Sequence, residues 1–189
     1  MKEVLLQYKT VRLENIFSAE ETILMKIREW RNLPEIRTVS LNQTEITEEE
    51  HLAWLNKIRK SLSDFVFIIY SDKIPCGVVQ LNHYSPERKE AYASAYILKD
   101  LAPVGTGIIS EYLLNIFFFH RLKGKLLHCE VLGENKRVLR FNQLLGYHIA
   151  KTRYEEIKTG KKSSRQMIYE MQMSAEDWHK QSIILEQMI

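Results

Sequence analysis

The amino-acid sequence predicts an α+β fold, in which helices flank a mixed and mainly antiparallel central sheet. Three observations predict it. Two helical segments come before the first strong strand signal, short polar turns join three neighbouring apolar strands, and an apolar helix separates the third strand from a fourth. Short turns join antiparallel strands and a helical crossover joins parallel ones, so both kinds of pairing are expected.

Length and composition are typical of one globular domain over residues 1–189. Hydrophobic residues make up 45% of the chain and charged residues 27%, and neither a repeat nor a flexible linker divides it. Because no run of about 18 apolar residues occurs, we expect a cytoplasmic protein with no membrane partner. The net charge of +3 is too small to indicate a nucleic-acid partner.

The first two helices are predicted from capping and periodicity. Residues 17–32 begin with capping-box spacing at Ser18 and Glu21, and Pro34 ends this helix. A second capping box is predicted at Thr47 and Glu50. The apolar face of the second helix is predicted to comprise Leu52, Leu55, Ile58 and Leu62.

The remaining elements follow from apolar runs separated by turns. The predicted strands cover residues 64–70, 74–84, 90–98, 125–132, 147–157 and 164–173, and residues 3–13 form a further candidate strand. The predicted helices of this half cover residues 108–122 and 135–146. The last two strands are expected to form a closing hairpin.

The helix over 108–122 begins at a Gly-x-Gly turn, formed by Gly105, Thr106 and Gly107. A helix start presents unpaired backbone amides and the positive end of the helix dipole, which suits a phosphate. A simple turn explains the same glycines, so this motif alone leaves both interpretations open. No Lys-Ser/Thr pair and no third glycine follow, which excludes a P-loop and a dinucleotide fingerprint.

A second motif, over residues 135–147, decides between these interpretations. Residues 102–107 resemble the Gln/Arg-x-x-Gly-x-Gly/Ala loop of the GNAT superfamily of acetyl-CoA-dependent N-acyltransferases, with Ala102 in place of Gln or Arg. Residues 135–147 resemble the superfamily's Asn-x-x-Ala-x-x-Phe-Tyr-x-x-x-Gly-Phe, and the matching or nearly matching positions are Asn135, Phe141, Gly146 and Tyr147. The order of elements fits this resemblance over nearly the whole chain.

The resemblance implies transfer of an acetyl group from acetyl-CoA, as cosubstrate and without a metal, to an amine. It also implies that the strand before the glycine turn splays from the next strand and binds the pantetheine arm through its free backbone. The cofactor-binding residues that it implies are Ile97, Leu98, Val104, Gly105, Thr106, Gly107, Ile108, Asn135 and Arg140.

Amine acetylation requires a base for the amine proton and a group that protonates the departing thiolate. His51 is a candidate base because histidine titrates near neutral pH, with a surface or capping role as the alternative. Glu130 is the second candidate, with an outward-facing strand position as its alternative. His83 and Tyr84, at the end of the predicted strand over 74–84, are the third, with an ordinary polar strand end as the alternative. Asn142 stands where the superfamily often has a tyrosine acid, and an amide cannot give up a proton. Tyr96 is therefore the candidate acid, or else a core residue.

Residues 29–37 and 48–55 resemble bacterial acetyltransferases that act on the 4-amino group of a nucleotide-activated amino sugar in pseudaminic acid biosynthesis. The candidate substrate-binding residues are Trp30, Arg31, Asn32, Arg37 and His83. Arginine can hold a phosphate through two parallel bonds, so Arg31 and Arg37 are candidates for that contact, with ordinary surface charge as the alternative.

The acceptor is expected to be a small-molecule amine, with a nucleotide sugar as the specific hypothesis. Protein N-termini, another small amine and a CoA-binding module without catalysis are the alternatives. The last of these follows from the departures at Ala102 and Asn142. The oligomeric state stays open, a homodimer included.

Overall fold

The computed structural model describes residues 5–160 and 162–189, whose strands form one eight-stranded sheet in the order β1-β2-β3-β4-β5-β6-β8-β7. All neighbouring pairs are antiparallel except β5 and β6, which are parallel. The strands are β1 (Leu5–Tyr8), β2 (Val11–Asn15), β3 (Phe65–Ser71), β4 (Ile74–Ser85), β5 (Glu90–Ile97), β6 (Leu126–Leu132), β7 (His148–Thr159) and β8 (Lys162–Ser174). The predicted mixed, mainly antiparallel sheet is confirmed.

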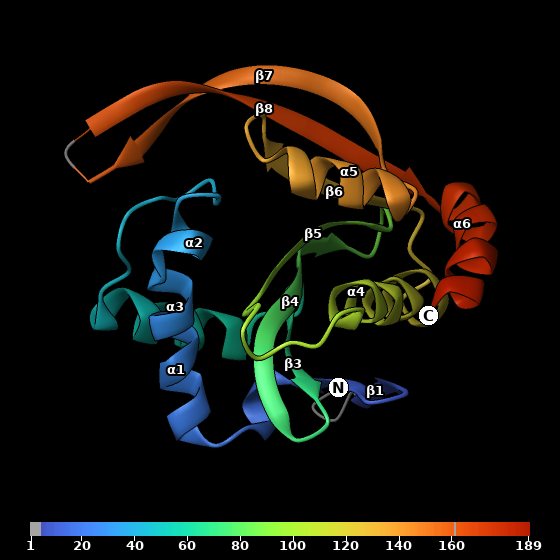
Figure 1. Cartoon of the computed structure of the whole chain (residues 1–189), viewed down its shortest axis with the longest axis horizontal. Coiled ribbons are helices and arrows are strands. Elements are labelled where there is room, and N and C mark those ends of the chain that lie inside the picture. The colour runs from blue at the N-terminus through green and yellow to red at the C-terminus, as the bar shows by residue number, and fades with distance from the viewer. Residues whose placement is uncertain (1–4, 161) are drawn as a thin grey trace.

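Helices cover both faces of the sheet (Figure 1). They are the short 3-10 turn η1 (Ile16–Ser18), α1 (Glu21–Asn32), α2 (Pro34–Arg37), α3 (Glu48–Lys60), α4 (Thr106–Asn115), the π-helical turn η2 (Ile116–Arg121), α5 (Lys136–Leu144) and α6 (Ala175–Met188). We call the side of the sheet with α1 to α3 the α1 face, and the side with α4 to α6 the α4 face. Among the helices described, none has the length and hydropathy that a membrane span requires.

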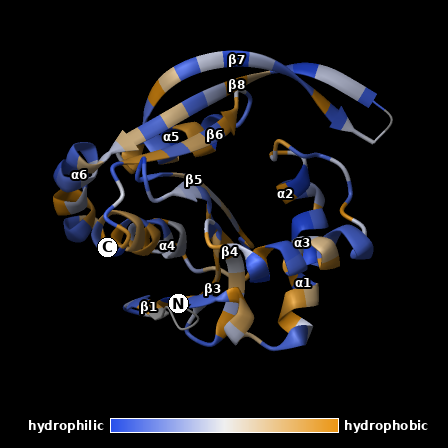
Figure 2. Ribbon diagram, turned by 180° about the vertical axis from the view of Figure 1, so that it is seen from behind, coloured by the Kyte–Doolittle hydropathy of each residue, from blue (hydrophilic) through white to orange (hydrophobic). Residues whose placement is uncertain are grey.

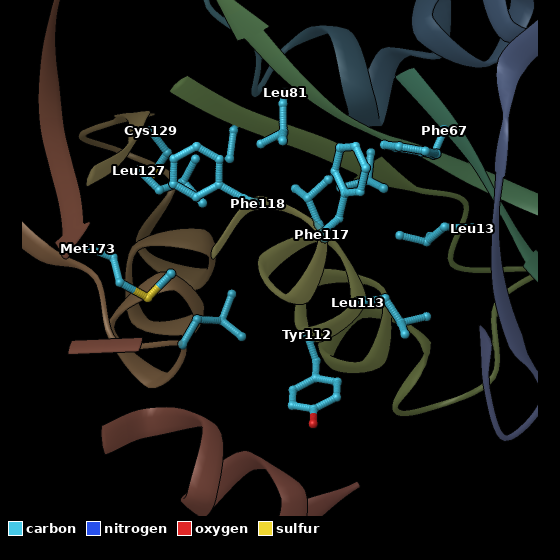
Figure 3. Packing of buried hydrophobic residues seen from close by; sticks show 14 of the residues in the cluster. Leu13, Phe67, Leu81, Tyr112, Leu113, Phe117, Phe118, Leu127, Cys129 and Met173 are labelled. Carbon is cyan, nitrogen blue, oxygen red and sulfur yellow. The ribbon is translucent and has the colours of Figure 1, made fainter. Parts of the chain in front are cut away.

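Alternate residues of the central strands point to opposite faces and build two cores. On the α4 face, Phe67 and Leu81 pack around Phe117 and Phe118 (Figure 3). On the α1 face, the buried strand residues Val66, Ile68 and Val78 pack against α1 and α3. The hydropathy pattern agrees, because α4 is largely hydrophobic whereas α1 and α3 alternate (Figure 2).

The first helix begins later than the sequence predicts. Ser18 ends the 3-10 turn, and Glu20 is the N-cap of α1 without a side-chain capping bond, so the predicted capping box at Ser18 and Glu21 is wrong. Pro34 lies just beyond the end of α1, as predicted, and it also begins α2. Proline is tolerated at a first helical position because the missing N–H would be unpaired there.

The second capping box is confirmed. The Thr47 hydroxyl accepts a bond from the Glu50 amide at 3.2 Å, and the Glu50 carboxylate accepts one from the Thr47 amide at 2.8 Å. The predicted apolar face is half wrong: the buried members are Leu55 and Ile58, and the exposed ones are Leu52 (44% exposed) and Leu62 (92%). Leu62 lies beyond the end of the helix, where the periodicity no longer holds.

The two ends of the chain contain elements that were not predicted. The candidate strand over 3–13 is a hairpin of β1 and β2, and its first two residues lie outside the described part of the chain. The helix α6 begins at a capping box formed by Ser174 and Asp177 and buries Trp178. That capping-box spacing is the sequence signal that could have predicted it.

The closing hairpin of β7 and β8 reaches across to the loop before α3 (Figure 1). The Thr159 hydroxyl donates to the Gln43 side-chain oxygen at 2.6 Å, and Leu41 packs on a small apolar cluster. The buried members of that cluster are Leu132, Ile157 and Ile168. The hairpin therefore encloses one end of the open part of the α1 face.

Candidate active site

The candidate active site is a fork between β5 and β6. These parallel strands pair only over residues 90–92 of β5 and 126–128 of β6. Beyond them, β5 continues with β4 as far as Ile97, whereas β6 continues with β8 as far as Leu132. One edge of β5 from residue 93 to residue 97 therefore has no strand partner in the described part of the chain. Its backbone N–H and C=O groups are available to a ligand.

A nest of backbone amides lies at the start of α4. Gly105 is the N-cap and has a φ of 93°, in the left-handed region that favours glycine. The amides that find no acceptor in the described part of the chain are those of Val104, Gly105, Gly107 and Ile108. Thr106 differs, because its amide donates to the Pro103 carbonyl at 3.1 Å. Four backbone amides without acceptors and the positive end of the helix dipole make this helix start suitable for an anion.

The second motif lies against this nest. A Cβ at Gly107 would lie 3.3 Å from the Ile97 side chain and 3.9 Å from Phe141, so the start of α4, the end of β5 and α5 meet there. Asn135 is the N-cap of α5, and its side-chain oxygen accepts the amide three residues further on at 3.2 Å. Arg140 is exposed on the same helix. Coenzyme contacts by Asn135 and Arg140 stay predictions.

Glu130 lies at the fork on the α1 face. It is the second residue of β6 after the last one paired with β5, and its side chain is 27% exposed. Its carboxylate contacts the Arg153 guanidinium at 2.9 Å, and Arg153 also contacts Glu155 at 2.9 Å and Glu170 at 3.3 Å. Three carboxylates thus surround one cation, which makes this side of the fork favourable for an amine.

Aromatic and polar side chains continue the α1 face of the sheet beside Glu130. The rings of Tyr92 and His128 stack with centroids 5.0 Å apart, and the exposed ring of His83 meets Tyr92 edge-on at 6.4 Å. The Gln80 amide donates to the Ser94 hydroxyl at 2.8 Å. No local sequence pattern indicates the pairing of Tyr92 with His128, because the crossover helix separates them along the chain.

The α4 face of the fork presents neutral groups. Cys129 immediately follows the last β6 residue that pairs with β5, and it is 7% exposed. The Asn142 side-chain amide donates to its sulfur at 3.3 Å. Burial raises the pKa of the Cys129 thiol, so the sulfur stays protonated at neutral pH.

Solved structures that superpose on the chain include acetyltransferases. A GCN5-related N-acetyltransferase from Brucella melitensis superposes with a TM-score of 0.78 at 14% identity, covering 99% of this chain and 86% of the other. Spermidine N-acetyltransferase from Vibrio cholerae, in complex with CoA and spermine, superposes with a TM-score of 0.78 at 16% identity, covering 90% and 98%. The chain has the GNAT N-acetyltransferase fold. The predicted GNAT fold is confirmed.

One relative with this fold is also similar in sequence. Acetyltransferase PseH of Campylobacter jejuni subsp. jejuni serotype O:23/36 (strain 81-176) is 26% identical over 133 residues, which cover 70% of this chain and 82% of PseH. The crystal structure of C. jejuni PseH in complex with acetyl coenzyme A superposes with a TM-score of 0.62 at 21% identity, covering 87% of this chain and 98% of the other. No protein-family model matches the chain.

Within this GNAT fold, a cavity of about 380 Å³ lies between the α1–α2 turn and the end of β5. Trp30 and Ile36 line one wall, and Ile97 and Leu98 line the other. Trp30 is only 9% exposed and packs in the core of the α1 face. Its predicted role in substrate binding is therefore limited to forming this apolar wall.

Arg31 and Arg37 each follow a residue that lines this cavity, Trp30 and Ile36. One Arg31 guanidinium nitrogen donates to the Asn42 carbonyl at 2.8 Å, and the other is buried without a partner among the described residues. Burial lowers the pKa of Arg31, the Tyr96 hydroxyl raises it, and the nearby Arg37 lowers it again. Neither arginine forms an ion pair within the described part of the chain. A substrate anion would satisfy both.

The structure contradicts the predicted roles of His51 and Asn32. His51 is 3% exposed, its Nε2 bonds to the Leu24 carbonyl at 2.8 Å, and burial lowers its pKa. A base needs access to the amine, and this imidazole has none. The Asn32 side chain donates to the Ile46 carbonyl at 2.9 Å and accepts from the Ile46 amide at 2.8 Å. Both residues hold α1 against the segment that follows it.

The predicted role of Tyr96 as the acid is also contradicted. Its hydroxyl donates to the Ile27 carbonyl of α1 at 3.3 Å, and burial raises its pKa. A phenol with a raised pKa and an occupied proton is a poor donor to a thiolate. Tyr96 therefore links β5 to α1, and the source of the thiolate proton has to lie elsewhere.

Proposed function

We propose that the chain is an acetyl-CoA-dependent N-acetyltransferase that acetylates a primary amine. The observation that carries this proposal is the amide nest of α4 beside the free edge of β5. The nest suits the pyrophosphate of the coenzyme, and the strand edge suits the amides of its pantetheine arm. The fork then receives the thioester. PseH with acetyl coenzyme A and the Vibrio cholerae enzyme with CoA support this assignment through their shared fold.

Glu130 is the proposed base. It faces the α1 side of the fork, where the open part of the sheet leaves room for an acceptor. The amine nitrogen attacks the thioester carbonyl carbon, and the amine proton passes to Glu130 directly or through one water. The C–S bond breaks and the thiolate leaves. Backbone amides on the free edge of β5 stabilise the charge that develops on the carbonyl oxygen.

We infer that the acceptor carries an anionic group as well as its amine, as the 4-amino sugar of a nucleotide-activated sugar does. Arg31 and Arg37 follow the cavity-lining residues Trp30 and Ile36 and form no ion pair in the described part of the chain, and the carboxylates around Arg153 lie at the fork. An amine at one end and a phosphate at the other would match these charges. The similarity to PseH supports the same acceptor class.

Two measurements test the proposal. Calorimetry with acetyl-CoA is expected to show binding, and a free-thiol release assay is expected to show turnover with a nucleotide-linked 4-amino sugar. Spermidine and N-terminal peptides serve as comparison acceptors, because they carry an amine but no phosphate. Turnover with these amines alone would overturn the acceptor class and leave the acetyltransferase activity standing. Binding without thiol release from any acceptor would identify a CoA-binding module, and absence of binding would overturn the whole proposal.

A further inference from the structure

The side of α4 that faces β6 and α5 carries two polar residues in a largely apolar helix. Glu111 and Asn115 are four residues apart, so they lie on the same side of the helix. Asn115 is fully buried, and neither its side-chain oxygen nor its nitrogen has a partner among the described residues. Leucine at either position would fill the same space without burying an unpaired polar group.

Further polar groups from β6 and from the segment after α5 meet these two. The Tyr147 hydroxyl is buried and finds no partner among the described residues. Burial raises its pKa, and Cys129 and Glu111 raise it further. Burial also raises the pKa of the Cys129 thiol, with Glu111 as the next cause. Gly107, four residues before Glu111 on the same side of α4, lies against Ile97 and Phe141, so this side of the helix faces the end of β5 and α5.

This cluster lies at the α4 side of the fork. Cys129 directly follows His128, the last β6 residue that pairs with β5, and Asn142 holds its sulfur. Glu130 lies on the opposite side of the same strand. A thioester in the fork would therefore have the base on one side and the Glu111 cluster on the other.

The cluster also supplies what Asn142 lacks. An amide can donate a hydrogen bond to the departing sulfur but cannot protonate it. Burial raises the pKa of Glu111 to about 7, so this carboxyl can hold a proton at neutral pH. The groups that face it, Cys129, Tyr147, Asn115 and Asn142, carry no charge there.

We propose that Glu111 is the acid that protonates the departing coenzyme A thiolate, a role that rests on the proposed function. The O–H bond of the carboxyl breaks and an S–H bond forms on the coenzyme, directly or through a water beside Asn142. Glu130 takes the proton that the amine loses and Glu111 gives one to the coenzyme sulfur, so each turnover leaves Glu130 protonated and Glu111 deprotonated. Solvent restores both groups as the products leave.

The test compares Glu111→Gln with Glu186→Gln, which alters a carboxylate bonded to Tyr112 of the same helix at 2.6 Å. Glu111→Gln is expected to lower kcat by about 100-fold and to leave acetyl-CoA affinity unchanged. The wild-type kcat is expected to decline above pH 7 as Glu111 loses its proton, and Glu111→Gln is expected to lack this decline. Asn142→Tyr in the Glu111→Gln background is expected to recover at least about 10-fold in kcat. Glu186→Gln is expected to match the wild type.

A purely structural Glu111 gives a different result. Glu111→Gln would then keep the wild-type kcat and pH profile and would unfold at higher denaturant concentration, which overturns the proton-donor role while acetyl transfer stands. A wild-type protein that fails to bind acetyl-CoA overturns the proposed function and the donor role together. The two failures are therefore distinguishable.

Discussion

The α4 side of the fork presents backbone amides and, apart from Glu111, uncharged side chains, whereas the α1 side presents carboxylates and arginines. The nest at Gly105 depends on the path of the main chain, and replacement of the expected Gln or Arg by Ala102 leaves those amides in place. The acceptor side depends on individual side chains, such as Glu130 and Arg37. Substitutions are therefore expected to act selectively on the acceptor side, and only changes in backbone or charge are expected to disturb the nest.

The largest effect on the acceptor side is expected from Glu130→Gln. Loss of the base should lower kcat by about 100-fold or more, with little change in acetyl-CoA affinity. Glu155→Gln is the matched control, because Glu155 contacts the same Arg153 at 2.9 Å but lies on β7. Steady-state kinetics of both variants would contradict the assignment if they lose activity equally, since the ion cluster and not the base would then be responsible.

A smaller effect is expected from Arg37→Gln. Loss of one charge-assisted contact should raise the KM for a phosphate-bearing acceptor by about 10-fold, equivalent to roughly 1.4 kcal/mol. The KM for acetyl-CoA should not change, because the nest lies on the other side of the sheet. Arg59→Gln on α3, where the guanidinium packs on Phe17, is the control. An equal rise in the KM for acceptors that carry no anionic group would contradict a contact between Arg37 and the phosphate.

The smallest effect on catalysis is expected from His51→Leu. Its kcat/KM should stay within about 2-fold of wild type, while loss of the bond to Leu24 should lower the free energy of unfolding by about 1 kcal/mol at pH 7. Burial lowers the folded pKa of His51, so the unfolded chain binds the proton first as pH falls below 6.5. Wild-type stability should therefore fall from pH 7 towards pH 5, and the deficit of the variant should shrink.

Urea unfolding at several pH values measures this difference. His179→Leu, which alters an exposed histidine of α6, is the control and should change neither quantity. A large loss of activity in His51→Leu with unchanged stability would restore His51 as a base.

The features that were predictable are those with a local sequence signal. The paired glycines before an apolar helix predicted the nest, and Asn135 predicted the start of the helix α5. Both were predictable because turns and helix caps are encoded within a few residues. His51, Asn32 and Tyr96 were misassigned because their partners lie 27, 14 and 69 residues away along the chain. Such partners follow from helix packing, which single-residue patterns do not encode.

The charged and buried clusters were missed for a similar reason. Arg153 of β7 contacts Glu130 of β6 across β8, because the sheet order places these two strands on either side of β8. In the sequence, Glu111 is a single charged residue in a largely apolar helix. Its neighbours Cys129 and Tyr147 come from two other segments of the chain. Sheet order and helix placement bring these groups together, and neither is a local property of the sequence.

The most direct test of coenzyme binding at the nest is calorimetry of acetyl-CoA with Gly105→Asp and Gly160→Asp. Both glycines have positive φ, 93° and 60°, and a Cβ at either would contact nothing within 4 Å, so neither substitution introduces a steric clash. Only the first places a carboxylate at the amide nest. We expect Gly160→Asp to bind like the wild type and Gly105→Asp to lose at least about 100-fold in affinity. Equal affinity in all three proteins would contradict binding at this site.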